Sequence, residues 1–280
     1  MKNKFITIFI ILIFSLNFYK YSIAGDFIFK ITDLEIIDNG NIYKGNNRGK
    51  ITTSDKIEII SDNFEYLKKL NQLEANGDVV LIDFKKNIII NAEKIFYLKD
   101  KEKIYTIGKT LINISDKYYV EGYDLTLLKD KMILSSNKEA TITDNDFTIY
   151  KLNKFNYSIN NEILKGEKIS VTTNSNKIDS DKYFFETAFF NLKKNRFLAK
   201  DVNVKLHKTL FGDPQNDPRI NAASGYGDKF KTNFEKGVFT SCKKTDKCPP
   251  WKITSKKIQH DKIKKQVIYR DAWLEIYDFP

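Results

Sequence analysis

The sequence predicts an all-β protein, built as an open, twisted jelly roll or solenoid-like stack of antiparallel strands, and three observations support this. Small and apolar residues recur at every second position, as at Ala75, Gly77, Val79 and Leu81, which is the side-chain period of a β-strand. The linkers between such segments are short and charged, which suits hairpin turns better than crossover helices. No stretch shows a sustained apolar stripe with a period of 3.6 residues, so a parallel βαβ architecture is not expected.

A repeat of about thirty residues runs from residue 51 to residue 206. Ile88, Ile90 and Ala92 alternate within one copy. Ile95 and Tyr97 continue the alternation after an offset of one residue. Each unit has one apolar face and no partner for it, so neighbouring units must stack. Equivalent positions in successive copies are Leu67, Leu98, Leu128, Ser158 and Leu192.

The first 24 residues have the pattern of a cleaved secretory signal peptide. Lys2 and Lys4 precede an uncharged run over residues 5–19, and small residues at Ser22 and Ala24 suit signal peptidase. The alternative is a membrane anchor, but 15 helical residues span only about 22 Å of the roughly 30 Å hydrocarbon core. We therefore expect an exported protein that begins at residue 25, where a glycine and not an acylated cysteine stands.

The chain carries 47 Lys and Arg against 36 Asp and Glu, and a basic excess can indicate nucleic-acid binding. Only Arg48, Arg196, Arg219 and Arg270 are arginines. Arginine is the residue whose planar fork reads phosphates and base edges, so no nucleic-acid partner is expected.

The sequence offers little catalytic chemistry. His207 and His260 are the only histidines, and neither accompanies a nucleophile motif. No glycine-rich phosphate loop is present, and most carboxylates lie in lysine-rich turns typical of a solvated surface. Cys242, Cys248 and His260 would give a metal three ligands without a fourth. We expect no enzymatic activity, no cofactor and no metal, whereas export would permit a disulfide between Cys242 and Cys248.

The repeat is interrupted after residue 208. Residues 210–219 hold two of the five prolines, and further turn formers follow, which predicts an irregular insertion over residues 209–250 that includes the cysteine pair. In the final repeat, Val267 and Trp273 take the places of Leu73 and Val79. The expected organisation is a signal peptide (1–24), a β-repeat domain (25–208), the insertion (209–250) and a final β-repeat (251–280).

Several segments are apolar on both faces of the expected strand, as over residues 78–82 and 87–91. One interpretation is a core packed on two sides. The other is that one face lines an apolar groove that a lipid fills. Periodicity alone does not separate the two.

Segments of the C-terminal third carry a resemblance to a known family. Residues 237–242 read GVFTSC and continue as KKTDKCPPW to Trp251, followed by IQHD at 258–261 and IYRDAWLEIY at 268–277. Together with NDPR at 216–219, these segments resemble the LptD family of outer-membrane proteins that assemble lipopolysaccharide. The repeat region resembles the OstA-like periplasmic domain of that family only in pattern, which related bridge proteins share.

The resemblance implies an OstA-like open jelly roll in the periplasm that accepts lipopolysaccharide and passes it to an outer-membrane β-barrel. Family members continue into that barrel where this chain ends at Pro280, so the barrel is expected to be absent and the chain to be the periplasmic portion. Disulfides that join domain and barrel in the family would lack partners, which favours a local bond between Cys242 and Cys248.

The resemblance also favours the groove over the closed core. Acyl chains of lipid A would lie on the inward face, where each buried CH₂ contributes about 0.8 kcal/mol, and lysines at the rim would meet the phosphates. An open strand edge would pair with a periplasmic bridge protein, and an outer-membrane assembly lipoprotein would join if a barrel is present. Strand alternation assigns lipid binding to Val79, Leu81, Ile88, Ile90, Ile95, Tyr97, Ile112, Val120, Leu125, Leu127, Ile142, Phe155 and Tyr157.

Two alternatives stay open. A free periplasmic or anchored bridge protein of the same transport pathway would share the fold, but would not be expected to carry the CPPW segment. A secreted β-solenoid that binds polysaccharide would display aromatic residues and carboxylates on an exposed face, whereas the aromatic residues here interleave with aliphatic ones.

Overall fold

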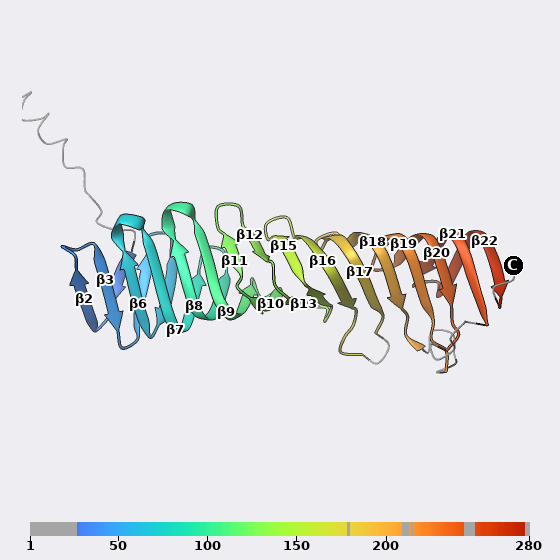
Figure 1. Ribbon diagram of the computed structural model, residues 1–280, viewed down its shortest axis with the longest axis horizontal. Coiled ribbons are helices and arrows are strands. Elements are labelled where there is room, and N and C mark those ends of the chain that lie inside the picture. The colour runs from blue at the N-terminus through green and yellow to red at the C-terminus, as the bar shows by residue number, and fades with distance from the viewer. Residues whose placement is uncertain (1–26, 178–179, 209–212, 214, 244–249, 278–280) are drawn as a thin grey trace, which may run out of the picture.

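The computed structural model describes residues 27–177, 180–208, 213, 215–243 and 250–277, and within them the antiparallel strands are stacked along one long axis (Figure 1). Two single-turn 3₁₀ helices, η1 (Lys68–Leu70) and η2 (Lys99–Lys101), lie in hairpin turns. The strands are β1 (Phe27–Lys30), β2 (Asp33–Ile37), β3 (Ile42–Asn46), β4 (Gly49–Thr53), β5 (Ile57–Ser61), β6 (Asn63–Leu67), β7 (Gln72–Asp83), β8 (Ile88–Leu98), β9 (Lys103–Ile114), β10 (Tyr118–Tyr123), β11 (Thr126–Leu128), β12 (Ile133–Ser136), β13 (Ala140–Asp144), β14 (Ile149–Leu152), β15 (Lys154–Ser158), β16 (Ile163–Thr172), β17 (Lys182–Asn191), β18 (Arg196–Lys205), β19 (Arg219–Asp228), β20 (Lys231–Thr240), β21 (Trp251–Asp261) and β22 (Gln266–Ile276). The predicted all-β antiparallel stack is confirmed.

Strand pairing divides the stack into two facing sheets. Sheet A runs through β1, β4, β5, β10, β13 and β14, and sheet B through β2, β3, β6, β11, β12 and β15. The long strands β7, β8 and β9, and those from β16 onward, belong to both, because one half of each pairs in sheet A and the other half in sheet B. The line along which they cross is called the hinge below.

Bulges bend the long strands at the hinge. The register of β7 with β8 shifts between Asn76 and Val79, and that of β8 with β9 shifts between Ala92 and Lys94. A bulge adds a residue to one strand and bends it sharply, so the strand can turn from one sheet into the other. The offset expected after Ala92 is confirmed. Non-glycine residues with positive φ in the later long strands are Lys168, Asp201, Lys236 and Asp271.

Hairpin turns of both sheets lie along the edge opposite the hinge, which we call the seam. Short turns of sheet A span residues 54–56, 84–87, 115–117 and 145–148. Turns of sheet B span residues 38–41, 68–71, 99–102, 129–132, 159–162, 192–195, 229–230 and 262–265.

The interior between the sheets is one continuous apolar cluster, organised as rows of cross-strand neighbours along the long axis. These rows are built from strands far apart in sequence, so stacking buries each repeat's apolar face. Row A in sheet A contains Ile51, Ile59, Leu81, Ile90, Ile112, Val120, Ile142, Tyr150, Val171, Tyr183, Val204, Ile220 and Phe239. Row B in sheet B contains Tyr66, Leu73, Tyr97, Ile104, Leu127, Leu134, Tyr157, Leu164, Phe190 and Phe197.

The predicted repeat register holds for four of its five positions. Leu67, Leu98, Leu128 and Ser158 fall in one cross-strand row. The equivalent residue of the fifth repeat in that row is Asn191. The prediction of Leu192 was therefore wrong by one residue. Leu192 instead begins a hairpin turn, where its N–H donates to the Glu162 carbonyl at 2.8 Å.

The predicted irregular insertion is wrong over its middle part, because β19 and β20 form a regular hairpin there. Glycine and alanine suggested turns, but here they provide space for the neighbouring strand's side chains. A Cβ on Gly225 would lie only 3.1 Å from Cδ1 of the fully buried Phe234. Of the described residues that flank this hairpin within 209–250, none belongs to a strand.

The predicted alignment of the last repeat with residues 73–79 is right for the residues before the hinge and wrong for those after it. Val267 follows His260 in row B, as expected from Leu73. Trp273 pairs with Thr254 on the outer face and is 69% exposed, whereas Val79 is buried. β7 crosses the hinge with two consecutive positive-φ residues, 77 and 78, and β22 with only one, residue 271. The alternation after the hinge therefore differs by one residue.

Candidate functional site

All thirteen residues assigned to lipid binding point into the interior between the sheets. Their exposed fractions are 4% or less, and all belong to the continuous apolar cluster. Their chain neighbours Val80, Ile89 and Leu128 are half-buried on the outer faces, as strand alternation requires. The structure thus brings the thirteen together, and their binding of lipid stays a prediction.

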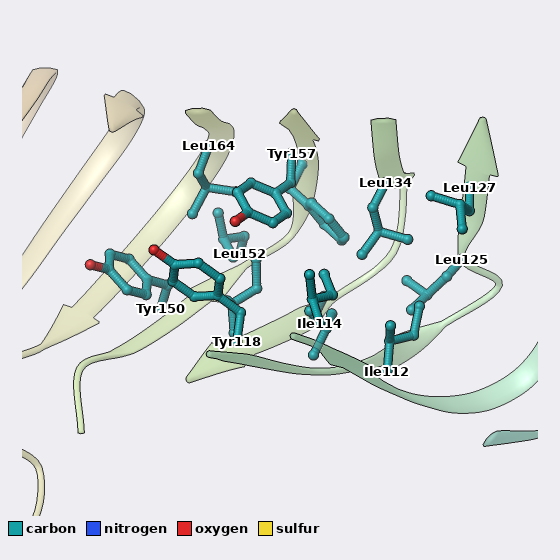
Figure 2. Packing of buried hydrophobic residues seen from close by; sticks show 14 of the residues in the cluster. Ile112, Ile114, Tyr118, Leu125, Leu127, Leu134, Tyr150, Leu152, Tyr157 and Leu164 are labelled. Atoms are coloured by element: carbon teal, nitrogen blue, oxygen red, sulfur yellow. The ribbon is translucent and has the colours of Figure 1, made fainter. Parts of the chain in front are cut away.

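The two sheets contribute side chains that point toward each other. Figure 2 shows Ile112 and Ile114 of β9 facing Leu134 of β12, and Tyr118 of β10 beside Tyr157 of β15. The rings of Tyr118 and Tyr157 meet edge to face, with centroids 5.6 Å apart. Because the rows interdigitate across the interior, acyl chains entering here would replace contacts between the sheets.

Three groups of ion pairs join the rims of the two sheets across the seam. In the first, Lys129 of sheet B places Nζ 2.7 Å from Oδ2 of Asp55 in sheet A. The same ammonium lies 2.9 Å from Glu102 Oε2 and donates to Tyr97 Oη at 2.9 Å. Lys99 adds a second ammonium 3.3 Å from Asp55 Oδ2. This first seam ion pair covers the apolar interior near the N-terminal end.

The charges of the first seam ion pair are held by their surroundings. Burial alone would raise the pKa of Asp55, but hydrogen bonds from Lys129 and Thr53 outweigh it and hold that pKa well below its usual range. Burial likewise acts to lower the pKa of Lys129, yet its acceptors raise it above the usual value. Both groups therefore stay charged across the neutral range.

The second seam ion pair lies farther along the axis. Lys117 of sheet A places Nζ 2.5 Å from Glu162 Oε2 of sheet B. Tyr118 donates its hydroxyl to the same oxygen at 2.8 Å. Burial and this hydrogen bond to a carboxylate raise the pKa of Tyr118. The phenol is thus a fixed donor that aligns Glu162 with the lysine.

The third seam ion pair joins the loop before β17 to the turn after β21. Lys262 places Nζ 3.1 Å from Asp181 Oδ2 and 5.4 Å from the centroid of the Tyr183 ring. The other carboxylate oxygen of Asp181 accepts the His207 backbone N–H at 3.1 Å. Burial acts to lower the pKa of Lys262, but Tyr183 and Asp181 raise it above the usual value.

A cavity of about 440 Å³ opens in the seam between the second and third ion pairs. Turn residues of both sheets form its rim, and rows A and B form its floor. Polar and charged residues at the rim are Asp144, Asp146, Thr148, Asn174, Asn195, Arg196, Asp228, Lys229 and Lys262. Aromatic residues at the floor are Tyr150, Tyr183, Phe185, Phe190 and Phe197.

The aromatic floor is a connected set of rings. Phe190 lies edge to face with Tyr150 at 5.4 Å and with Phe185 at 6.0 Å between centroids. Phe197 lies 5.6 Å from Phe185 and 6.2 Å from Phe190. The floor is therefore apolar and fixed by ring packing, and it continues directly into the interior rows.

The sheet B rim of the seam is rich in lysine. Two or more lysines lie in each of the turns 68–71, 99–102, 129–132, 192–195 and 262–265. Because these turns follow one another along the axis, an apolar interior runs beside a basic rim. Such an arrangement suits an amphiphile with apolar chains and an anionic head group.

Row B becomes polar toward the C-terminal end, where Thr232 and His260 continue it. His260 is buried at 3% exposure, and its Nδ1 has no hydrogen-bond partner among the described residues. Burial lowers the pKa of His260, so the imidazole is neutral at physiological pH. Sequence analysis placed His260 in a segment of alternating residues but did not predict that its side chain is buried.

The disulfide prediction lies partly outside the described residues, which include Cys242 but not Cys248. Cys242 is half-buried, with Sγ 3.6 Å from the Trp251 carbonyl oxygen. The expected signal peptide, residues 1–24, also lies outside. In the part of the chain that the structure describes, no three His, Cys, Asp or Glu residues gather as a metal site, and no helix has the length and apolarity needed to cross a membrane.

No family model and no curated protein matches the chain. Among solved structures it is similar to LptH, the LptA-homologous periplasmic component of the conserved lipopolysaccharide transport device of Pseudomonas aeruginosa. The TM-score is 0.36 at 10% sequence identity, and the match covers 39% of this chain and 80% of that chain.

Proposed function

We propose that the chain is an exported, periplasmic lipopolysaccharide-carrying domain, which accepts acyl chains between its two sheets and passes them along its axis toward the outer membrane. The observation that carries the proposal is the pair of inward apolar rows, which extend beside a lysine-rich rim. The sequence resemblance to the LptD family supports it. The thirteen interior residues would contact the acyl chains, and the rim lysines the phosphates.

Loading requires the two sheets to move apart locally, because interior side chains such as Leu81 and Ile142 are fully buried. An acyl chain inserted between the sheets would give the side chains of rows A and B apolar contacts like those that the two rows now make with each other. The exchange is therefore close to neutral in hydrophobic free energy, and the seam ion pairs and head-group contacts decide its direction.

The ends of the stack offer edges for the proposed partner proteins. Within the described residues β1 pairs only with β4, β2 only with β3, and β22 only with β21. Exposed apolar side chains lie on these edge strands, including Ile28, Ile36 and Trp273. A periplasmic bridge protein would add a strand to one edge, and an outer-membrane lipoprotein would join at the membrane.

Photo-crosslinking at paired positions in cells tests the proposal. A crosslinking residue at Ile90 or Leu127 should capture lipopolysaccharide, and one at the chain neighbour Ile89 or Leu128 should not, because one step along a strand reverses the side chain. Adducts at both members of a pair would indicate surface adhesion. Absence of adducts at Ile90 and Leu127 in correctly folded protein would refute the proposal.

A further inference from the structure

Residues of both interior rows reach the surface at the seam cavity. Tyr150 and Tyr183 of row A and Phe190 and Phe197 of row B line it. Row B continues from Phe190 to Leu164 and on into the interior. A chain that enters the cavity therefore meets the same apolar rows that run toward the N-terminal end.

The size and lining of the cavity select an apolar chain. Its volume of about 440 Å³ lies in the range of about 300 to 1,000 Å³ typical of small-molecule sites. Its floor offers ring faces and edges together with the hydroxyls of Tyr150 and Tyr183, and its charged groups lie at the rim. The cavity is bounded by hairpin turns and not by a free strand edge, so a peptide could not add here by backbone pairing.

Basic side chains gather on one side of the rim. Lys193, Lys194 and Arg196 in or beside the turn 192–195 are exposed, as is Lys229 of the neighbouring turn. Lys193 and Arg196 interact at longer range with Glu162 and Asp228 and lower the pKa of those carboxyl groups. The basic side of the cavity is therefore available for an anionic group.

Two of the three carboxylates at the rim accept backbone N–H groups within turns. Asp144 accepts the backbone N–H groups of Asp146 and Thr148, both at 2.9 Å. Asp228 accepts those of Phe230 at 2.8 Å and Lys231 at 2.9 Å. These hydrogen bonds hold the two carboxylates in their turns and favour their charged form, so an incoming anion would be held on the basic side of the rim.

We propose that this cavity is a side port through which one fatty acyl chain of a phosphorylated lipid enters the interior, its phosphate held by the basic side of the rim. The port deepens the proposed function and rests on it. It gives the lipid a way in that does not pass through the strand edges at the ends of the stack.

Site-specific photo-crosslinking with purified protein tests the port, using phosphorylated lipid A in detergent micelles as the probe. One reporter replaces Phe230, which lines the cavity and is 48% exposed. The matched control replaces Ile263, which is 68% exposed on the next turn of the same rim. Leu134 reports loading of the interior, with Leu164 as a second interior reporter should the Leu134 variant fold poorly. We expect several-fold more adduct at Phe230 than at Ile263, appearing before the interior adduct.

The outcomes separate the port from the proposed function. Interior adducts with equal labelling at Phe230 and Ile263 would overturn the port and leave the function standing. No adduct at any position would overturn both. Equal labelling of Phe230 by lipid A from which the phosphates have been removed would overturn the head-group assignment.

A charge-reversal pair tests the basic side of the rim. Lys193→Glu with Lys194→Glu should slow interior loading roughly tenfold, since local charge steers association by factors of about 10 to 1,000. The control, Lys68→Glu with Lys69→Glu, changes the same rim at a distant turn and should have little effect. Equal slowing by both pairs would mean that the whole rim attracts lipid, and the port would be overturned.

Discussion

Replacing Lys129 with methionine should loosen the seam near the N-terminal end. The ammonium contacts Asp55 at 2.7 Å, Glu102 at 2.9 Å and Tyr97 at 2.9 Å, and the side chain is only 8% exposed. Methionine keeps an unbranched apolar stem but removes the charge and the donors. The substitution therefore isolates the electrostatic contribution from packing.

The expected loss follows from burial. Removing one partner of a fully buried ion pair costs about 3 to 5 kcal/mol. Here the carboxylates are 28% and 35% exposed, and Lys99 remains 3.3 Å from Asp55. We therefore expect a loss of about 1 to 2 kcal/mol in the free energy of unfolding.

The assay combines urea unfolding with hydrogen exchange, because a stacked array can open in parts. The Lys129 backbone N–H donates to the Glu102 carbonyl at 2.8 Å, so its exchange rate reports local opening. Lys109→Met is the control, since Lys109 and Glu121 also lie 2.7 Å apart but are 58% and 54% exposed. Equal shifts in the two variants would refute the argument that the buried seam pair holds the sheets together.

The contribution of Asp55 to the free energy of unfolding should decrease at acidic pH. The pKa of Asp55 lies below its ordinary value of 3.8 in the folded protein. Its contribution is therefore complete above about pH 4 and is lost as the pH falls through the folded pKa. The difference between the wild type and Lys129→Met should shrink in that acidic range.

Three further substitutions test the interior. Leu81→Ala, at a fully buried row A position, should lower the free energy of unfolding by about 2 to 5 kcal/mol in urea. Gly166→Ala would place a Cβ 2.5 Å from Leu152 Cδ2 and should cost about 1 to 3 kcal/mol, measured the same way. Burial lowers the pKa of His260 below 6.5, so stability should fall as the pH drops below 6.5, and His260→Gln should flatten that slope.

The sequence was sufficient to predict the strands and the inward face of the repeat region. A strand with one buried face fixes its register, because a slip of one residue would expose every apolar side chain. The alternation could not be followed through the hinge. Gly77, Asp78 and Asp271 adopt positive φ. The amino-acid sequence does not distinguish a bend that uses one such residue from a bend that uses two. Trp273 was misplaced for that reason.

The seam was not predicted, because it depends on two distant turns meeting in space. Asp55 and Lys129 are 74 residues apart, and each lies in a turn that alone is typical of a solvated surface. Only the facing of the two sheets brings them together. One usable signal was present in β17, where phenylalanine occurs in two adjacent pairs, 184–185 and 189–190. One ring of each pair, Phe185 and Phe190, lies at the cavity floor.

Burial divides the seam charges into two groups with different tasks. Lys129 and Lys262 are largely shielded from solvent and each has a carboxylate partner, so moderate salt screens their pairs little. Lys193 and Lys194 are exposed and lie beside the cavity, where salt screens their attraction for an anion strongly. Under the proposed function, salt should therefore weaken recognition of a head group before it weakens the contact between the sheets. Because the two groups use different lysines, the seam could stay closed while the basic rim attracts the anionic lipid of the proposed function.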